Sequence, residues 1–407
     1  MTTASLGDTK PKNNNQKNDQ SDDDLGWKFS LKLGLMFLLS RLPFLHGFLP
    51  ESLRLQLPTG WNFEMFWTAF SSGGRRFYYD YYCELKQPTS YAPKVEVEPK
   101  FQLTEDDIRD FYYKGYMGPF DLVPEDEIKE LREYLVNHTL QQESSLFSFE
   151  NGDYEFDNQD GNLLTSWDEE ITEQYKNFYI NYLKKMNRHF DEPRVMELFE
   201  NPAVTERAAQ LLGSDLLLWR TTFFDIEPGK KGTELHQGSA WFYENQQEPV
   251  LTPHNREELY QVTCWVALTD STQENGCMIM YPGTGDRIYP IKLSDMEQDG
   301  ANNVYGPRGA KIDYPGGLPE PDYLEVKAGQ FILFSGRYIH GSLDNNSENC
   351  RWGLNGRIAK TSTRVYTKAM LERTYHHKYF RLKYNSMNKW RAILLRGEDK
   401  YGYNKYE

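Results

Sequence analysis

Two histidines and two arginines in the second half of the chain have the spacing expected of groups that hold a metal ion and an anion. His236 stands one residue before Gly238, and His340 lies far downstream, followed by Arg351 and Arg357. Two histidines and one carboxylate can hold Fe(II) on one face and leave positions open for reactants. In that layout the carboxylate would stand at Gly238. The residues therefore predict an iron site that lacks its anionic protein ligand.

The composition indicates an acidic globular protein with a large core. The chain has 407 residues, enough for one large domain with extensions or for two domains, and is 39% hydrophobic with a formal net charge of -14. That charge argues against nucleic-acid binding, because no broad basic excess is available to neutralise phosphates. The four cysteines form no CxxC pair. This disfavours a cysteine zinc site and a disulfide framework, and it fits a cytoplasmic location.

The first hundred residues divide into a polar tail and an apolar extension. Residues 1–24 are rich in Asn, Asp, Lys and Gln, carry no secretory signal and are predicted to be disordered. Residues 25–100 form an N-terminal extension whose apolar segment, 31–49, is too short for the ~20 residues that span a bilayer. Two interpretations remain open. The segment is a helix packed on the catalytic domain, or an interfacial helix that contacts a membrane surface or covers a greasy substrate.

Helices are predicted first along the chain, and strands later. Thr104 is expected to cap one helix and Pro124 to start a second, with helical periodicity again at 171–189 and 195–212. Short apolar segments separated by Gly and Pro then predict the strands of a barrel or sandwich. These lie at 216–228, 260–268, 276–281, 323–326, 330–334 and 352–359. The pattern predicts an α+β chain that is mainly β with flanking helices, followed by a basic, aromatic C-terminal tail at 369–407.

The chain resembles the phytanoyl-CoA dioxygenase-like family from about Phe101 to Lys368. The resemblance rests on the helical preface LTEDDIRDFYYKGYMGPFDLVPEDEIKEL, on TELHQGSAWF, on WVALTDSTQENGCMIMYPGT and on the strand that ends at His340. It implies a double-stranded β-helix core at 101–368, a jelly roll of cupin-like form, with Fe(II)- and 2-oxoglutarate-dependent chemistry. Within the family, Gly or Ala in place of the metal-binding carboxylate is typical of aliphatic halogenases, and Gly238 has this feature.

The resemblance gives each candidate residue a role and implies Fe(II), 2-oxoglutarate, O2 and chloride or bromide as cofactors. Charge counting supports the halide, because chloride would supply both the missing negative charge and the missing ligand. The even spacing of the two arginines places both on one face of a strand, where a guanidinium fork suits a carboxylate of 2-oxoglutarate. The metal ligands are His236 and His340, which with Gly238 form the catalytic centre; Gly238, Trp241, Thr263 and Arg357 surround the halide; Thr233, Trp265 and Arg351 bind 2-oxoglutarate.

Two alternatives to a halogenase remain at this point. One is a hydroxylase of the phytanoyl-CoA dioxygenase type in which Glu234, Glu244 or Asp270 binds the iron. The other is a non-catalytic, iron-free binding protein that keeps the jelly roll. The expected substrate is a fatty-acyl group or another natural-product precursor, either free or tethered to an acyl carrier protein that docks on the basic tail. The oligomeric state is left open.

Overall fold

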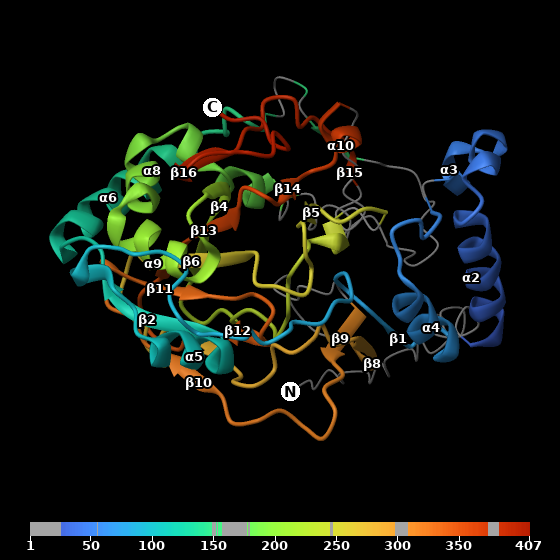
Figure 1. Cartoon of the computed structure of the whole chain (residues 1–407), viewed down its shortest axis with the longest axis horizontal. Helices are drawn as coiled ribbons and strands as arrows, with labels where there is room; N and C mark the ends of the chain where they lie inside the picture. The colour runs from blue at the N-terminus through green and yellow to red at the C-terminus, as the bar shows by residue number, and fades with distance from the viewer. Residues whose placement is uncertain are drawn as a thin grey trace, which may run out of the picture.

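Two antiparallel sheets form the core of the protein, as the computed structural model shows (Figure 1). The structure describes residues 26–54, 56–148, 152, 154–156, 177, 180–244, 247–297, 308–372 and 382–407. The large sheet has the strand order β16-β4-β13-β6-β11-β2, and the small sheet the order β10-β7-β12. Their strands are β2 (Tyr116–Asp121), β4 (Leu216–Ile226), β6 (Gln261–Ala267), β7 (Met278–Met280), β10 (Asp322–Leu324), β11 (Gln330–Phe334), β12 (His340–Ser342), β13 (Arg351–Lys360) and β16 (Ile393–Arg396).

Alternation along β6 explains why the large sheet has one helix-covered face and one face toward the small sheet. Val262, Cys264 and Val266 pack in the cluster that contains the helices. Trp265 and Ala267 pack with residues of the small sheet instead. Successive side chains of a strand point to opposite faces. The residues of β6 that alternate with Val262, Cys264 and Val266 therefore point into the space between the two sheets. The predicted fold, mainly β with flanking helices, is confirmed.

Four helices pack on the face of the large sheet that carries Val262, Cys264 and Val266. They are α5 (Glu105–Lys114), α6 (Glu125–Asn137), α8 (Pro193–Glu200) and α9 (Pro202–Leu212). Thr104 caps α5 as predicted, in a reciprocal capping box with Asp107. The helix predicted over 195–212 is two helices, because Pro202 has no amide hydrogen to continue α8 and the Asn201 side chain caps α9. The helix predicted over 171–189 falls mainly outside the described residues, although 180–185 are helical.

The helices of the N-terminal extension lie at one end of the molecule, at the right of Figure 1. The extension contains α2 (Trp27–Ser40), η1 (Pro43–Phe48), α3 (Glu51–Arg54) and α4 (Phe63–Ser71), and β1 (Arg76–Phe77) then pairs with β8 (Ile291–Glu297), which pairs with β9 (Arg308–Ile312). None of the helices in the described residues is both long and apolar enough to cross a membrane. The tail predicted at 1–24 lies outside the described residues.

The C-terminal segment completes the edge of the large sheet, a role that its basic composition does not predict. β16 pairs with β4, and the fully buried Trp390 donates its indole N–H to the carbonyl of Trp219 at 3.1 Å. The remaining elements are α10 (Lys368–Glu372), β3 (Tyr154–Phe156), β5 (Leu251–Thr252), β14 (Arg364–Val365), β15 (Leu382–Asn385), η2 (Pro99–Phe101), η3 (Thr139–Gln141), η4 (Arg188–Phe190) and η5 (Phe242–Glu244).

Candidate active site

His236 and His340, far apart in the sequence, are direct neighbours in the structure. The His236 amide donates to the His340 carbonyl at 2.8 Å, and the His340 amide donates back at 3.1 Å. Their ring centroids are 4.2 Å apart. This backbone bridge joins the loop after β4 to the first residue of β12, and it brings together the two predicted metal ligands.

The second nitrogen of each imidazole is positioned by the backbone. His236 Nδ1 lies 2.8 Å from the carbonyl oxygen of Glu234, and His340 Nδ1 lies 2.8 Å from that of Tyr338. A carbonyl only accepts, so each Nδ1 carries the hydrogen and each Nε2 keeps a lone pair for a metal. Burial lowers the pKa of His236 to about 4 and that of His340 well below its ordinary value. Both rings are therefore neutral at pH 7, which is the form that binds a metal.

Gly238 is not required by its backbone or by packing. Its φ angle lies outside the left-handed region that favours glycine, and a Cβ atom added to it would meet no atom within 4 Å. Among the described residues, no group of three or more His, Cys, Asp and Glu side chains could hold a metal. The two histidines are thus left without an acidic partner in this part of the chain, and an open space lies where a side chain at 238 would begin.

The three acids considered as replacement ligands have other roles. Glu244 forms a buried ion pair with Arg220, with 2.9 Å between Oε2 and Nη2. Asp270 accepts the amide hydrogen of Ala328 at 2.9 Å. Glu234 contributes its backbone carbonyl to His236, as described above. No carboxylate among them completes the metal site in this structure.

Arg357 lies with Thr263 and Trp241, so the structure brings together three of the residues predicted to surround a halide. Its Nη1 donates to Thr263 Oγ1 at 3.1 Å, and its guanidinium carbon is 4.5 Å from the centre of the Trp241 ring. Its Nε has no partner, and burial lowers its pKa. The Arg357 charge also lowers the pKa of His236 and of His340, so this cation lies within electrostatic range of both imidazoles. Trp241 has a φ of 51°, a strained conformation for a large side chain.

The structure also brings together Arg351 and Trp265, two of the residues predicted to bind 2-oxoglutarate. The Arg351 guanidinium carbon lies 5.6 Å from the Trp265 ring centre, and its Nη2 donates to the Gly276 carbonyl at 2.7 Å. Burial lowers the Arg351 pKa to about 10, and its Nε has no partner. A buried guanidinium held by neutral groups is suited to an incoming carboxylate. Thr233 lies beside β12, where its amide donates to Ser342 Oγ at 2.8 Å.

Asp80 of the N-terminal extension holds the loop that follows Gly238, a role that the sequence did not reveal. One carboxylate oxygen accepts the amide hydrogens of Ser239 and Ala240, at 2.5 and 2.9 Å, and the other accepts that of Phe242 at 2.8 Å. Burial raises the Asp80 pKa, while these hydrogen bonds lower it. Only a single acidic residue within an aromatic run, YYDYY, could have drawn attention to it.

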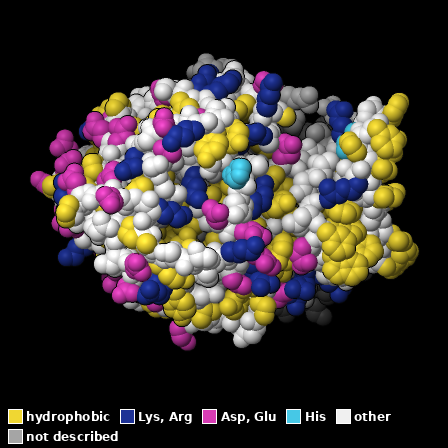
Figure 2. Space-filling model, viewed as in Figure 1, with side chains coloured by type: hydrophobic (Ala, Val, Ile, Leu, Met, Phe, Trp, Pro, Cys, Tyr) yellow, Lys and Arg dark blue, Asp and Glu magenta, His cyan; other side chains and the backbone are white. Residues whose placement is uncertain are grey.

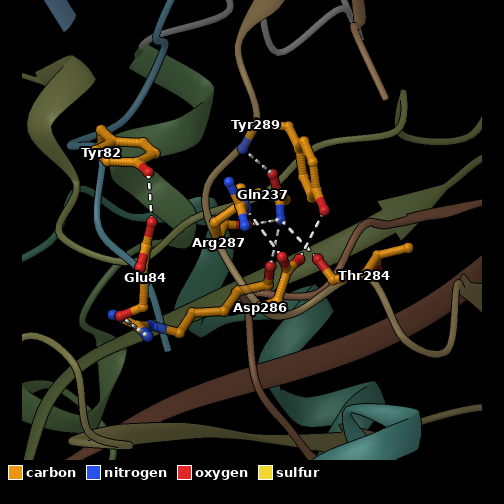
Figure 3. A network of polar contacts seen from close by, with 8 residues as sticks. Tyr82, Glu84, Gln237, Thr284, Asp286, Arg287 and Tyr289 are labelled. Atoms are coloured by element: carbon orange, nitrogen blue, oxygen red, sulfur yellow. Dashed lines mark hydrogen bonds and ion pairs between the residues drawn. The ribbon is translucent and has the colours of Figure 1, made fainter. Parts of the chain in front are cut away.

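Gln237, the residue between the first histidine and the glycine, anchors the same loop to its neighbours (Figure 3). Its amide nitrogen donates to the carbonyls of Arg287 at 3.0 Å and Thr284 at 3.3 Å, and its amide oxygen accepts the Tyr289 N–H at 2.8 Å. The side chain is buried, so these bonds replace its hydration and fix the backbone on both sides. Around it, pairs link Tyr82 to Glu84 and Asp286 to Arg287 and Tyr289.

Comparison with known proteins identifies the family. The sequence model of phytanoyl-CoA dioxygenase (PhyH) matches residues 111–353, more than half of the chain. The chain belongs to the phytanoyl-CoA dioxygenase family. A phytanoyl-CoA dioxygenase of Arabidopsis thaliana is 25% identical over 266 residues, which cover 61% of this chain and 86% of the relative. An ectoine dioxygenase of Bordetella bronchiseptica is 25% identical over 215 residues, 45% of this chain and 64% of the relative.

Solved structures support the same fold. The structure of CytC3 with Fe(II) and alpha-ketoglutarate superposes with a TM-score of 0.52 at 22% identity, and it covers 75% of this chain and 94% of its own. A second CytC3 structure gives a TM-score of 0.50 over 75% and 93% of the two chains. Family membership and this fold make the protein an Fe(II)- and 2-oxoglutarate-dependent oxidoreductase with a cupin-like core.

Proposed function

We propose that this oxidoreductase is a halogenase that replaces an unactivated aliphatic C–H bond by C–Cl or C–Br. The observation that carries the proposal is the open space at Gly238 beside two neutral, backbone-oriented imidazoles. Glycine is needed there neither for the backbone nor for packing. Its presence is accounted for if an external anion, instead of a protein carboxylate, completes the metal site.

The charges around the site favour an anion. Arg357 is a half-buried cation whose Nη1 donates to the neutral hydroxyl of Thr263, and its Nε has no partner. Fe(II) would add two further positive charges, which 2-oxoglutarate balances when it binds. The guanidinium then remains within electrostatic range of the imidazoles, and a charge that is partly removed from water is costly without a counter-charge. A halide near Gly238, Arg357 and Thr263 would supply it.

Each side chain has a defined task in this proposal. Iron held by His236 and His340 would activate O2, the oxidant in a reaction by which C–H, chloride, O2, 2-oxoglutarate and a proton become C–Cl, succinate, CO2 and water. Arg351 would bind a carboxylate of 2-oxoglutarate, with Trp265 against its guanidinium. Asp80 and Gln237 would keep the loop through Gly238 in place, so that the halide and the substrate C–H bond are aligned.

We further propose an acyl substrate, either a fatty-acyl group or another natural-product precursor tethered to an acyl carrier protein. The family resemblance favours such substrates, and the excess of lysine and arginine in the C-terminal segment would suit the acidic surface of a carrier. The second candidate function is a hydroxylase, which the names of two relatives, phytanoyl-CoA dioxygenase and ectoine dioxygenase, favour.

The deciding experiment compares Gly238→Asp with Gly238→Ala. Aspartate would fill the open space and place a negative charge on the halide position, so we expect loss of chlorinated product. Alanine adds a methyl group with no atom within 4 Å of its Cβ, so this control should fold and retain iron. Product mass spectrometry with chloride, with bromide and with neither measures the outcome. Whether the aspartate variant gains hydroxylation depends on hydrogen bonds that would orient the new side chain.

Two results would refute the halogenase. The first is a wild-type enzyme that gives only hydroxylated product on its preferred substrate in the presence of chloride. The second is an aspartate variant that chlorinates as fast as the wild type. The first result would leave the hydroxylase as the function, since both activities use the same iron and co-substrate site.

A further inference from the structure

Helix α2 of the N-terminal extension turns an apolar stripe toward solvent. Trp27, Leu31, Leu35 and Leu38 are between 59% and 70% exposed. Their spacing places them on one side of the helix, because residues three and four positions apart share a face. A helix of a globular protein normally directs such a stripe inward. The outward orientation therefore needs a reason.

The opposite face of α2 is packed, which fixes the orientation of the stripe. Phe37 stacks on Phe66 of α4 with ring centroids 4.1 Å apart, and Ser30 Oγ donates to the Phe70 carbonyl at 2.6 Å. Leu33 is buried on the same side. The helix is thus held against the rest of the extension by one apolar face, while the second apolar face has no covering among the described residues.

Neighbouring elements extend the stripe into a larger surface, which we call the apolar face. Figure 2 shows hydrophobic side chains gathered at the end of the molecule that Figure 1 assigns to α2 and α4. Phenylalanine and tryptophan dominate the added residues, and they are 50–86% exposed. The apolar face consists of Trp27, Leu31, Leu35, Leu38, Phe44, Phe48, Phe63 and Trp67.

Basic side chains accompany the apolar face. Lys28 and Lys32 are exposed along one edge of the α2 stripe, and exposed Arg41 lies over the Phe37 ring at the end of the helix. Residues 26–50 contain no Asp or Glu, although the whole chain has a net charge of -14. Dark-blue side chains also flank the hydrophobic ones at this end in Figure 2. The surface therefore combines bulky apolar groups with a local positive charge.

We propose that the apolar face inserts into the interface of a lipid bilayer that contains anionic headgroups. A helix that lies in the plane of a membrane presents large apolar side chains to the acyl boundary and lysines to the headgroups. Aromatic rings are favoured at that depth. Monomeric soluble proteins rarely expose contiguous apolar patches larger than a few hundred Å², and such patches mark interaction sites. The proposal concerns the attachment of the protein to a membrane and does not depend on the reaction that its iron site performs.

Vesicle flotation with the full-length protein tests the proposal. We expect the wild type to float with phosphatidylcholine vesicles that contain phosphatidylglycerol, and less with phosphatidylcholine alone. Leu31→Glu/Leu35→Glu should lower the bound-to-free ratio at least tenfold on both. Lys28→Gln/Lys32→Gln should lower binding only to the anionic vesicles. Tyr113→Ser, at a 63% exposed residue of α5, is the matched control and should bind like the wild type.

Three results would overturn the proposal. The first is a wild type that remains in solution with every kind of vesicle. The second is a leucine variant that floats with vesicles as well as the wild type does. In the third, sedimentation without lipid would show a wild-type dimer that the leucine variant splits, with no vesicle binding, and the face would then join two copies of the chain. Circular dichroism and iron content should match the wild type in each variant, since the substituted side chains are exposed.

Discussion

At the scale of single residues, the site is defined by neutral groups that surround positive charge. His236 and His340 are uncharged. Arg351 is buried and Arg357 is half-buried, and each has a neutral hydrogen-bond partner and an unpartnered Nε atom. Such an arrangement is unfavourable until anions arrive. 2-Oxoglutarate and a halide would provide these anions. The charges and hydrogen-bond partners of these residues therefore suit the binding of both anions.

Replacing either histidine should remove the metal. If Gly238 supplies no ligand, His236→Ala or His340→Ala leaves one imidazole, so we expect bound iron and turnover to fall below detection. The amount of iron per chain after anaerobic loading, measured by inductively coupled plasma mass spectrometry, tests this loss of metal. His254→Ala, at an exposed histidine, is the control and should load like the wild type. Stoichiometric, active iron in either site variant would show that the metal is held elsewhere.

Replacing Arg351 should weaken co-substrate binding. Losing a hydrogen bond to a charged group costs about 1.5–3 kcal/mol, and each ~1.4 kcal/mol is a factor of ten in affinity. We therefore expect Arg351→Ala to raise the concentration of 2-oxoglutarate needed for half-maximal turnover at least tenfold, while iron loading is retained. Arg351→Lys keeps the positive charge but loses the forked guanidinium. Its 2-oxoglutarate requirement should lie between those of the wild type and the alanine variant. An unchanged requirement in the alanine variant would transfer the role to Arg357.

At the scale of elements, the candidate active site contains a loop held on three sides. The loop through Gly238 is fixed by the backbone bridge of His236, by the buried amide of Gln237 and by the carboxylate of Asp80. The last contact comes from the N-terminal extension, more than 150 residues earlier in the chain. The extension therefore has a role beyond its apolar face, because it supports the loop that carries the candidate halide site.

An element can be predicted from the sequence when neighbouring residues signal it, but not when its contacts come from distant parts of the chain. The cap at Thr104, the strand β11 and the two histidines are signalled by neighbouring residues, so local patterns were enough. The break between α8 and α9 has a local signal in Pro202 that helical periodicity concealed. Asp80 has no local signal, because its partners are backbone amides that only the folded chain brings near. The same holds for the pairing of β16 with β4.

Asp80→Asn should disturb this loop more than an ordinary surface change. The asparagine amide group would direct N–H bonds at backbone amides that now donate to a carboxylate, so at least one buried donor loses its acceptor. We expect the free energy of unfolding to fall by about 1–3 kcal/mol, together with a weaker apparent affinity for chloride. Urea unfolding and the chloride dependence of turnover measure both effects.

The control for this change is Asp110→Asn, which removes an exposed ion pair with Lys114 on α5. Exposed pairs contribute about 0–1 kcal/mol, so its unfolding midpoint should stay near that of the wild type. If Asp80→Asn behaves like this control in both measurements, the carboxylate is not needed to hold the loop.

At the scale of the whole molecule, charge is distributed unevenly. The chain has a net charge of -14, yet lysine and arginine outnumber acidic residues in its C-terminal segment. Lys389 and Lys405 are exposed there, near the edge strand β16. The apolar face lies on a different part of the molecule (Figure 1). The two surfaces can therefore serve different partners, a bilayer at one and an acidic protein at the other.

We expect an acyl carrier protein to dock on this C-terminal segment and deliver the acyl substrate. Lys389→Glu/Lys405→Glu should lower turnover of the carrier-bound substrate several-fold and leave turnover of the free acid unchanged, because only the first requires attraction between the two proteins. Added salt should have the same selective effect, since exposed charges are screened over about 8–10 Å at physiological ionic strength. Lys28→Glu/Lys32→Glu on α2 reverses as many charges elsewhere and serves as the control. Equal turnover of free and carrier-bound substrate, before and after charge reversal in the C-terminal segment, would exclude this docking site.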